Sequence, residues 1–453
     1  MGNHLRHRTA IGLGATLLLG LGVAACGTDE QPTGKDGNSG GSGEVQTITF
    51  WQSQFYGLED EWYASRVADF NATHADIQVE YEVIPSDAWD QKLKAAQAAG
   101  TAPDVYTRAY NTLMALARSQ SIRPLDDLLS ESAWQDLEAS VEKMVIVDGQ
   151  HYAYPVLVEP SMVLWYRSDL FEQAGLDPDD PPTDWDGLIE VAERLKGAAT
   201  DAPLAMPQRV EDLAWSTWGL QYSSADHLPL AGDWSAAQAD DPAYKSLLDM
   251  YRALYADGLI PPQALDEYTA YAPYGEGKVA MMANGSWAAA GLLSDYPEIA
   301  ELTRVAKFPS ASGDDQSPTA SLGGWTLVID GRTESADAAG AFVEWMVAGE
   351  ADPLVKYFAD TSYSKFPARQ SVNLAIGDTD EAAQVNPWRS LIASDVVPYS
   401  IAEPVYDWSV SLAFAGAIEA AMQGQASDEA LRRAQEEITG IVDQLGIAGQ
   451  GPE

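Results

Sequence analysis

The 453-residue chain contains only one cysteine, Cys26, and five histidines. A single cysteine cannot form an intrachain disulfide, and it cannot supply a Cys-based zinc or iron–sulfur site. The histidines beyond the N-terminal region, His74, His151 and His227, are far apart in the sequence, and no H-E-x-x-H motif occurs. We therefore expect neither a bound metal nor any other cofactor.

Basic residues are also scarce, because 26 Lys plus Arg stand against 68 Asp plus Glu and give a formal net charge of −42. Such a chain would repel the phosphate backbone of a nucleic acid, and direct docking on anionic lipid is disfavoured for the same reason. Hydrophobic residues nevertheless make up 46% of the chain, with 14 Trp and 20 Tyr. This content excludes a disordered chain of low hydrophobicity. We expect a large folded protein that does not bind nucleic acid.

The N-terminus is typical of a secretion signal. Two arginines precede the apolar residues 10–22, a stretch that is too short to span a bilayer. The sequence Leu-Gly-Val-Ala-Ala-Cys-Gly at residues 21–27 resembles the bacterial lipobox, whose cysteine is lipidated and becomes the first residue of the mature protein. We expect residues 1–25 to be removed and Cys26 to carry a lipid anchor. An ordinary signal peptide with a chance cysteine is the alternative.

A polar segment separates Cys26 from the expected folded part. Residues 27–44 contain no aliphatic or aromatic side chain, which is the composition of a flexible tether. Residues 37–41 match the letters of a G-x-S-x-G nucleophile motif, but that motif needs a strand-to-helix turn that such a composition cannot build. We expect residues 26–44 to be the lipidated cysteine and its tether.

From Val45 onward, hydrophobic periodicity predicts alternating strands and helices. Strands are expected near residues 45–51, 77–84 and 103–106, with helices around residues 62–70 and 88–99 between them. This alternation is typical of a parallel sheet in an α/β fold. Further strands are expected at residues 278–282, 303–308 and 325–329, and further helices begin near residues 184 and 427.

Short motifs then follow one another in a fixed order: Ile48-Thr49-Phe50-Trp51, Ala102-Pro103-Asp104-Val105, residues 149–155, residues 164–171, residues 182–185, residues 277–287, Gly323-Gly324-Trp325 and Phe366-Pro367-Ala368-Arg369. Together they resemble the family 1 extracellular solute-binding proteins, the carbohydrate-capturing components of bacterial ABC importers, which include the maltose-binding proteins. The resemblance covers Val45 to about Ile447.

The resemblance implies an α/β fold of the periplasmic-binding-protein type, in which two lobes are joined by hinge crossings and close around a ligand in the cleft between them. By this analogy, residues 45–155 plus 312–350 form lobe 1. Residues 156–311 plus 351–453 form lobe 2.

The candidate ligand-binding residues follow from this resemblance and from the chemistry of a sugar. Sugar rings present CH-rich faces to aromatic planes and hydroxyls to carboxylates, amides and arginines. Trp287 follows an expected strand on a tight turn, Trp325 follows two glycines, and Glu159 matches the place of a sugar-binding acid in maltose-binding proteins. The full candidate set is Trp51, Gln52, Gln54, Asp104, Arg108, Asn111, Glu159, Trp215, Trp218, Trp287, Trp325, Arg369 and Trp388. For Trp215 and Trp218, a place in the core is an equal alternative.

These observations together predict capture without catalysis. A lipid-anchored receptor on the extracytoplasmic face of the bacterial membrane would bind a neutral mono- or oligosaccharide and deliver it to an ABC permease, and the resemblance implies a monomer. Phosphorylated or strongly anionic sugars are expected to bind poorly unless Arg108 or Arg369 lines the site. Two alternatives stay open: a surface lipoprotein that binds a polysaccharide or a protein partner, and a glycoside hydrolase, since carboxyl separations cannot be measured in a sequence.

Overall fold

The structure, a computed structural model, describes residues 45–452 apart from residues 56, 87, 378 and 379. The expected signal peptide, Cys26 and nearly all of the tether lie outside the described residues. No helix within the described part of the chain combines the length and the apolar character needed to cross a membrane.

The first lobe is built on a five-stranded sheet with the order β2-β1-β3-β13-β6. Its strands are β1 (Gln46–Ser53), β2 (Ile77–Ile84), β3 (Val105–Ala109), β13 (Trp325–Ile329) and β6 (Tyr154–Pro155). β1 pairs in parallel with both β2 and β3, as the alternation of strands and helices predicts, whereas β13 runs antiparallel to β3 and β6.

Helices cover both faces of this sheet. The ring of Phe50 on β1 lies 6.0 Å from the ring of Tyr63 on α1 (Gly57–Thr73). The next residue, Trp51, lies under Lys92 of α2 (Trp89–Ala99), with 4.6 Å between the ammonium and the ring centroid. Because successive side chains of a strand point to opposite faces, α1 and α2 cover opposite sides of β1. α2 ends at Gly100 in the left-handed conformation, with φ 71°, as expected.

The second lobe contains a four-stranded sheet with the order β11-β8-β10-β9. Its strands are β11 (Thr303–Lys307), β8 (Val163–Arg167), β10 (Val279–Asn284) and β9 (Ala202–Ala205). All six residues of β10 are buried, because helices cover this sheet. One of them, α7 (Trp185–Arg194), begins at the expected position, where the Asp184 carboxylate accepts a hydrogen bond from the Gly187 amide at 2.7 Å.

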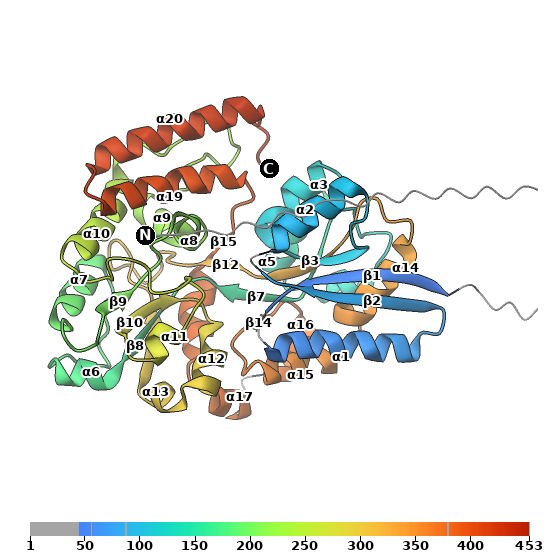
Figure 1. The fold of residues 1–453 in the computed structure, drawn as a ribbon, viewed down its shortest axis with the longest axis horizontal. Helices are drawn as coiled ribbons and strands as arrows, with labels where there is room; N and C mark the ends of the chain where they lie inside the picture. Colours follow the sequence, from blue (N-terminus) through green and yellow to red (C-terminus); the bar gives the residue numbers. More distant parts are fainter. Residues whose placement is uncertain (1–44, 56, 87, 378–379, 453) are drawn as a thin grey trace, which may run out of the picture. The chain divides into compact units, whose positions relative to one another are not determined.

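The remaining helices of six or more residues surround the two sheets. They are α3 (Leu113–Arg118), α6 (Ser168–Gln173), α8 (Val210–Ser216), α9 (Trp218–Ala225), α10 (Lys245–Ala256), α12 (Ala288–Asp295), α14 (Ala336–Val343), α15 (Asp352–Asp360), α16 (Gln370–Ile376), α17 (Asp380–Val385), α19 (Trp408–Met422) and α20 (Ser427–Leu445). In Figure 1, α19 and α20 lie side by side, and α19 packs against α8 and α10 of the second lobe.

A third sheet, β14-β7-β12-β15, is formed by segments that connect the lobes. β7 (Leu157–Pro160) lies in the chain between β6 of the first lobe and β8 of the second. It pairs antiparallel with β14 (Phe366–Pro367) and with β12 (Ser321–Gly323), and β12 pairs in parallel with β15 (Ile401–Ala402). This sheet therefore brings residues near 159, 323 and 403 together from distant parts of the sequence.

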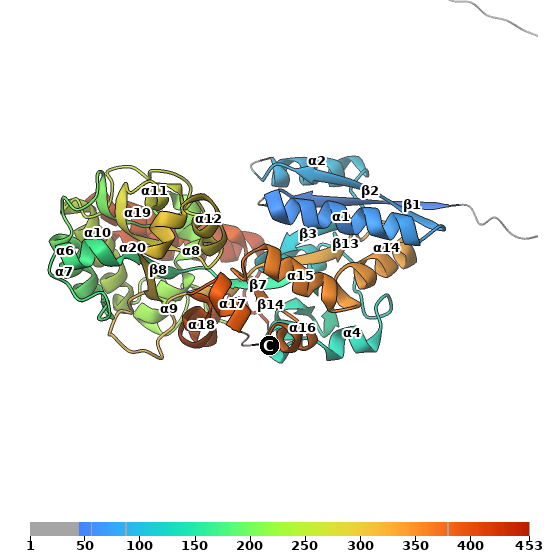
Figure 2. The same ribbon diagram turned by 90° about the horizontal axis from the view of Figure 1, so that it is seen from below.

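One part of the expected division of the chain needs correction. We assigned residues 351–453 to the second lobe, but α15 and α16 pack with the first. Leu354, Tyr357 and Val372 belong to the same buried cluster as Phe50, and Figure 2 shows α15 beside α1. The other boundaries stay a prediction.

A buried ion pair adds to this apolar packing. The side chains of Glu59 on α1 and Lys365 are only 2% and 5% exposed, and they contact each other directly. The Glu59 carboxylate also accepts a hydrogen bond of 2.6 Å from the hydroxyl of Tyr357 on α15. The segment after α15 is thereby attached to α1.

We predict that Lys365→Met lowers the free energy of unfolding by about 3–5 kcal/mol, because the substitution leaves the Glu59 charge buried without its cation. The matched control is Lys356→Met, which removes an exposed pair with Asp360 on α15 and should change stability by no more than about 1 kcal/mol. Denaturant unfolding of both variants provides the measurement. Equal, small losses in the two variants would contradict a stabilising role for the buried pair.

Candidate functional site

A cleft of about 550 Å³ lies where the two lobes and the connecting sheet meet. Seven aromatic side chains line it: Trp89, Trp215, Trp218, Trp287, Trp325, Tyr406 and Trp408. Its polar lining includes Asp90, Lys94, Arg108, Asn111, Glu159, Ser161, Glu403, Asp407 and Ser411. The cleft thus combines apolar planes with carboxyl, amide and hydroxyl groups, which is the usual composition of a small-molecule site.

Seven of the candidate residues line this cleft, and six do not. The seven are Arg108, Asn111, Glu159, Trp215, Trp218, Trp287 and Trp325. The direction of β3 accounts for the first two, because the strand ends at Ala109 and its carboxyl end faces the cleft. The Arg108 guanidinium forms an ion pair with the Asp90 carboxylate at 3.0 Å, so its charge is already partnered by an acid of the same cleft.

The aromatic wall from the second lobe is held by ring contacts. Trp215 meets Trp287 edge to face, with 5.6 Å between centroids and 89° between planes, and it meets Tyr268 at 5.6 Å and 85°. The Trp287 indole donates a hydrogen bond of 3.3 Å to the Thr269 carbonyl. A Cβ atom at position 285 would lie 1.9 Å from the Trp287 ring, so Gly285 is required for this ring position. Rings locked in this way provide preformed surfaces for a ligand.

The remaining tryptophans differ in how much surface they offer. Trp218 is only 1% exposed, and its indole donates to the Ser411 hydroxyl at 3.0 Å. Trp408 is 38% exposed and meets Trp218 edge to face at 6.4 Å. Trp325 is partly exposed, and its ring lies 4.8 Å from Phe55. Trp218 therefore serves mainly to support Trp408, whereas Trp325 and Trp408 can contact a ligand.

Two carboxyl groups meet beside a glycine of the connecting sheet. Glu159 on β7 lies directly opposite Gly323 on β12, and Glu403 follows β15 on the other side of β12. A Cβ atom at position 323 would lie 2.1 Å from Oε1 of Glu403, so the missing side chain of Gly323 makes room for this carboxyl group. The Oε2 atoms of both glutamates are buried and have no hydrogen-bond partner among the described residues.

Burial raises the pKa of both glutamates to about 7, because the charged carboxylate loses its hydration. For Glu159, the positive charge of Lys365 opposes this rise in pKa and the negative charge of Glu59 adds to it. For Glu403, a hydrogen bond from the Asn111 backbone amide opposes the rise in pKa, and the charge of Glu159 adds to it. The two glutamates therefore form an electrostatically linked pair.

Three candidates from β1 and the loop after it are not among the residues that line this cleft. Trp51 packs beneath α2, as described above. The Gln52 side chain is fully buried and donates to the Asp60 carboxylate at 2.6 Å, because it points to the α1 face of the sheet. Gln54 is exposed just beyond the strand.

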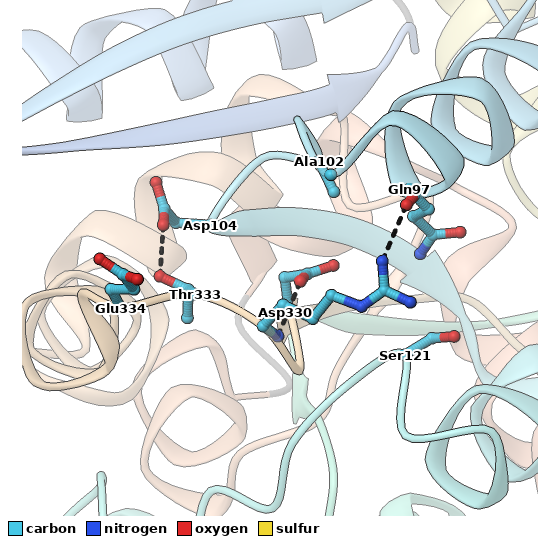
Figure 3. Close-up of a pocket in the computed structure, with 9 residues that line it drawn as sticks. Gln97, Ala102, Asp104, Ser121, Asp330, Thr333 and Glu334 are labelled. Atoms are coloured by element: carbon cyan, nitrogen blue, oxygen red, sulfur yellow. Dashed lines mark hydrogen bonds between the residues drawn. The ribbon is translucent and has the colours of Figure 1, made fainter.

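Asp104 lies at the opposite end of β3 from the cleft. It precedes the strand, and its carboxylate accepts hydrogen bonds from the Thr49 amide at 2.8 Å and the Thr49 hydroxyl at 2.9 Å. Figure 3 shows Asp104 beside Thr333 in a separate small pocket of about 210 Å³, which Asp330 and Glu334 also line. The ends of a strand face opposite edges of a sheet, so Asp104 does not reach the cleft at the other end of β3.

The last two candidates have structural partners. Arg369 is 5% exposed and donates to the Asp136 carboxylate at 2.6 Å and to the carbonyl oxygens of Val347 and Gly349. Trp388 is 4% exposed, and its indole donates to the Thr303 carbonyl at 3.2 Å. The donors of both side chains are used within the protein, so neither residue is available to the cleft.

Sequence reasoning missed several residues that line the cleft, notably Trp89 and the segment that contains Glu403, Tyr406, Asp407 and Trp408. Four polar or aromatic side chains within six residues of an irregular connection are a pattern that binding loops often show. This pattern could have identified the segment as a candidate binding loop from the sequence alone. Within the described residues, no group of three or more His, Cys, Asp or Glu side chains is placed to hold a metal ion.

A family model described as bacterial extracellular solute-binding protein matches residues 56–352 of this chain. An uncharacterized ABC transporter extracellular-binding protein from Pyrococcus horikoshii is 24% identical over 289 residues, or 61% of this chain and 63% of the relative. The sn-glycerol-3-phosphate-binding periplasmic protein UgpB from Shigella dysenteriae is 31% identical over 206 residues, or 42% of this chain and 45% of the relative. The similarity thus spans less than two thirds of the length of these curated relatives.

A solved structure extends the comparison over most of the chain. The cyclic alpha-maltosyl-1,6-maltose binding protein from Arthrobacter globiformis matches with a TM-score of 0.70 at 22% identity, over 88% of this chain and 100% of that chain. The expected two-lobe α/β fold is confirmed by this match.

The glutamate pair predicts a specific dependence of stability on pH. Between the ordinary glutamate pKa of about 4.3 and the folded value of about 7, the folded state binds more protons than the unfolded state, so stability falls as pH rises through this window. Glu403→Gln removes the part of this loss of stability that comes from the Glu403 carboxyl group. The variant should therefore gain about 1–3 kcal/mol relative to the unmodified protein between pH 5 and pH 8.

Chemical denaturation at pH 5 and pH 8 provides the measurement. The control is Glu436→Gln on the exposed face of α20. If Glu403→Gln and Glu436→Gln show the same change between the two pH values, the Glu403 carboxyl group is not desolvated in the folded protein.

Proposed function

Because the chain belongs to the family of bacterial extracellular solute-binding proteins, we propose that its cleft captures a sugar and presents it to an ABC permease for import. The protein acts in this proposal as a monomer outside the cytoplasm. The observation that carries the proposal is the cleft itself, in which Trp215, Trp325 and Trp408 offer apolar surface close to the carboxyl groups of Glu159 and Glu403.

A sugar matches both kinds of surface. The CH groups of its ring pack against aromatic planes. Its hydroxyls can donate to the Oε2 atoms of Glu159 and Glu403, which lack partners within the described protein. The buried Oδ1 atom of Asn111 is likewise without a partner in the described residues and is a further acceptor. Preformed acceptors of this kind favour a ligand that is rich in donors.

The charges of the cleft argue against an anionic ligand. Four acids, Asp90, Glu159, Glu403 and Asp407, line it with only two bases, Lys94 and Arg108. The sequence led us to expect poor binding of anionic sugars unless Arg108 or Arg369 lined the site. Arg108 does line it, but its guanidinium is paired with Asp90. The name of the relative UgpB indicates a phosphorylated ligand for that protein. For this chain we propose a sugar without phosphate or carboxylate groups, in keeping with the neutral ligand expected from the sequence.

We also propose binding without catalysis. A pair of carboxyl groups in a sugar-sized cleft has the residue types of a glycosidase, but the family to which the chain belongs is one of binding proteins. The alternative of a surface protein that recognises a polysaccharide or a protein partner predicts that no small sugar stabilises the fold.

A thermal-shift screen of the purified protein against a library of mono- and oligosaccharides tests the proposal. A cognate sugar at about 100 times its Kd should add about 2.7 kcal/mol of stability. Trp215→Ala and Trp325→Ala should each raise that Kd about tenfold or more, since each removes apolar contact area. Trp134→Ala is the control, because Trp134 stacks on His151 outside the cleft. Absence of any stabilising sugar, or turnover of chromogenic glycosides at enzyme-like rates, would overturn the proposal.

We further propose that Cys26, which lies outside the described residues, carries the lipid anchor. In the producing bacterium, the protein should incorporate a labelled fatty acid and fractionate with membranes. Cys26→Ala should abolish the labelling and release the protein from the membrane fraction, because the thiol that would accept the lipid through a thioether bond is lost. Membrane association that persists in Cys26→Ala would show that another feature holds the protein there.

A further inference from the structure

We infer that the Glu159–Glu403 pair forms a subsite for a protonated amine, so that the preferred ligand of the cleft is a sugar bearing a basic nitrogen. This inference rests on the proposed function, since it assumes that the cleft binds a sugar. It departs from the expectation of a neutral ligand, because it adds one cationic group at a defined place.

The two glutamates have acceptor atoms that the described protein does not use. Each glutamate presents a buried Oε2 atom that receives no hydrogen bond from the described protein. A sugar hydroxyl donates one hydrogen and carries no charge, so a single hydroxyl cannot serve two carboxylates. An ammonium group carries three donors and one positive charge. One such group can therefore satisfy both carboxylates and offset their mutual repulsion.

The described cations around the two glutamates are paired with other acids or exposed to solvent. Glu159 and Glu403 take part in none of the ion pairs found among the described residues. Lys365, whose charge acts on Glu159, is bound directly to Glu59. Arg108 is bound to Asp90, and Lys94 is exposed on α2. The described protein therefore supplies no partner cation for this pair, and a ligand can.

The missing side chain of Gly323 leaves room for the Glu403 carboxyl group close to Glu159. Gly323 lies opposite Glu159, and any side chain at this position would collide with the Glu403 carboxyl group. Gly324 has φ +136°, and a Cβ atom there would lie 2.6 Å from the Leu157 carbonyl oxygen. Two successive glycines thus let both carboxyl groups approach the same region of the cleft.

The aromatic surroundings suit a cation as well as a sugar ring. Trp325 lies two residues after Gly323, and Tyr406 lies three residues after Glu403; both line the cleft. Aromatic faces attract cations through their quadrupole, and the attraction is stronger where water is excluded. Carboxyl groups with buried Oε2 atoms beside aromatic rings therefore favour an ammonium group over an uncharged hydroxyl.

Calorimetric titration with matched sugars tests this inference on the purified protein. The probes are three sets that differ at one substituent: glucose, glucosamine and N-acetylglucosamine; galactose, galactosamine and N-acetylgalactosamine; and cellobiose, the β-1,4-linked glucosamine disaccharide and its N-acetylated form. The titrations are run at pH 7, where most of each amine is protonated and part of the glutamate carboxyl groups, whose pKa is about 7, is ionised. In at least one set, the amine should bind at least tenfold more tightly than its hydroxyl counterpart, and N-acetylation should remove the gain.

Substitutions test whether the Glu159–Glu403 pair causes the tighter binding of the amine. Glu403→Gln and Glu159→Gln should each weaken amine binding at least tenfold and change binding of the hydroxyl counterpart less than threefold. Glu436→Gln on α20 removes one negative charge outside the cleft and should leave both affinities unchanged. Thermal melting of each variant verifies that it is folded, and the two glutamine variants provide independent tests.

The outcomes separate this inference from the proposed function. If neutral sugars bind but no amine is preferred, or if the preference survives in both glutamine variants, the amine subsite is refuted and the sugar-binding function stands. If amines bind no better because no sugar of the wider library binds at all, both proposals fail. A preference for the amine that both glutamine variants abolish supports the inference.

Discussion

The register between β7 and β12 is the constraint on which the cleft depends. It sets Glu159 opposite Gly323, and β15 adds Glu403 on the far side of the same strand. Because side chains alternate across a strand, a slip of one residue would turn Glu159 to the other face of the sheet. The two glycines fix this arrangement, since a side chain at position 323 would occupy the place of the Glu403 carboxyl group. The chemistry of the site is thus a consequence of backbone pairing between segments that connect the lobes.

Stability and ligand recognition are linked through one lysine. Lys365 joins the segment after α15 to α1 through Glu59, and its charge also lowers the pKa of Glu159 in the cleft. Because Lys365 is paired with Glu59, its charge lowers the pKa of Glu159 without forming an ion pair with that carboxyl group. Desolvated carboxyl groups lower the stability of the empty protein, and a ligand that supplies donors recovers that free energy on binding. The two glutamates of the cleft therefore serve ligand binding, whereas the acidic side chains on the surface are hydrated.

Much of the fold could be predicted from the sequence, because strands such as β2 and β10 and helices such as α7 carry clear periodicity and caps. Trp287 after β10, Trp325 at the start of β13 and Glu159 on β7 line the cleft as expected, and their contact with a ligand stays a prediction. Asp104 does not line the cleft, because a motif does not say which end of its strand faces the ligand. Glu403 was missed because β15 has only two residues and pairs with β12 across about eighty residues of chain. Pairing of that kind cannot be read from the local sequence, which shows only the polar and aromatic composition of a binding loop.

The central claim is that aromatic rings and the two glutamates of one cleft together hold a sugar. A crystal structure of the protein with the sugar that stabilises it most would test this claim directly. Our account predicts a ring packed against Trp215, Trp325 or Trp408, with a donor group of the ligand within hydrogen-bonding distance of Glu159 or Glu403. A sugar bound outside this cleft, or bound within it without contact to either glutamate, would contradict the account.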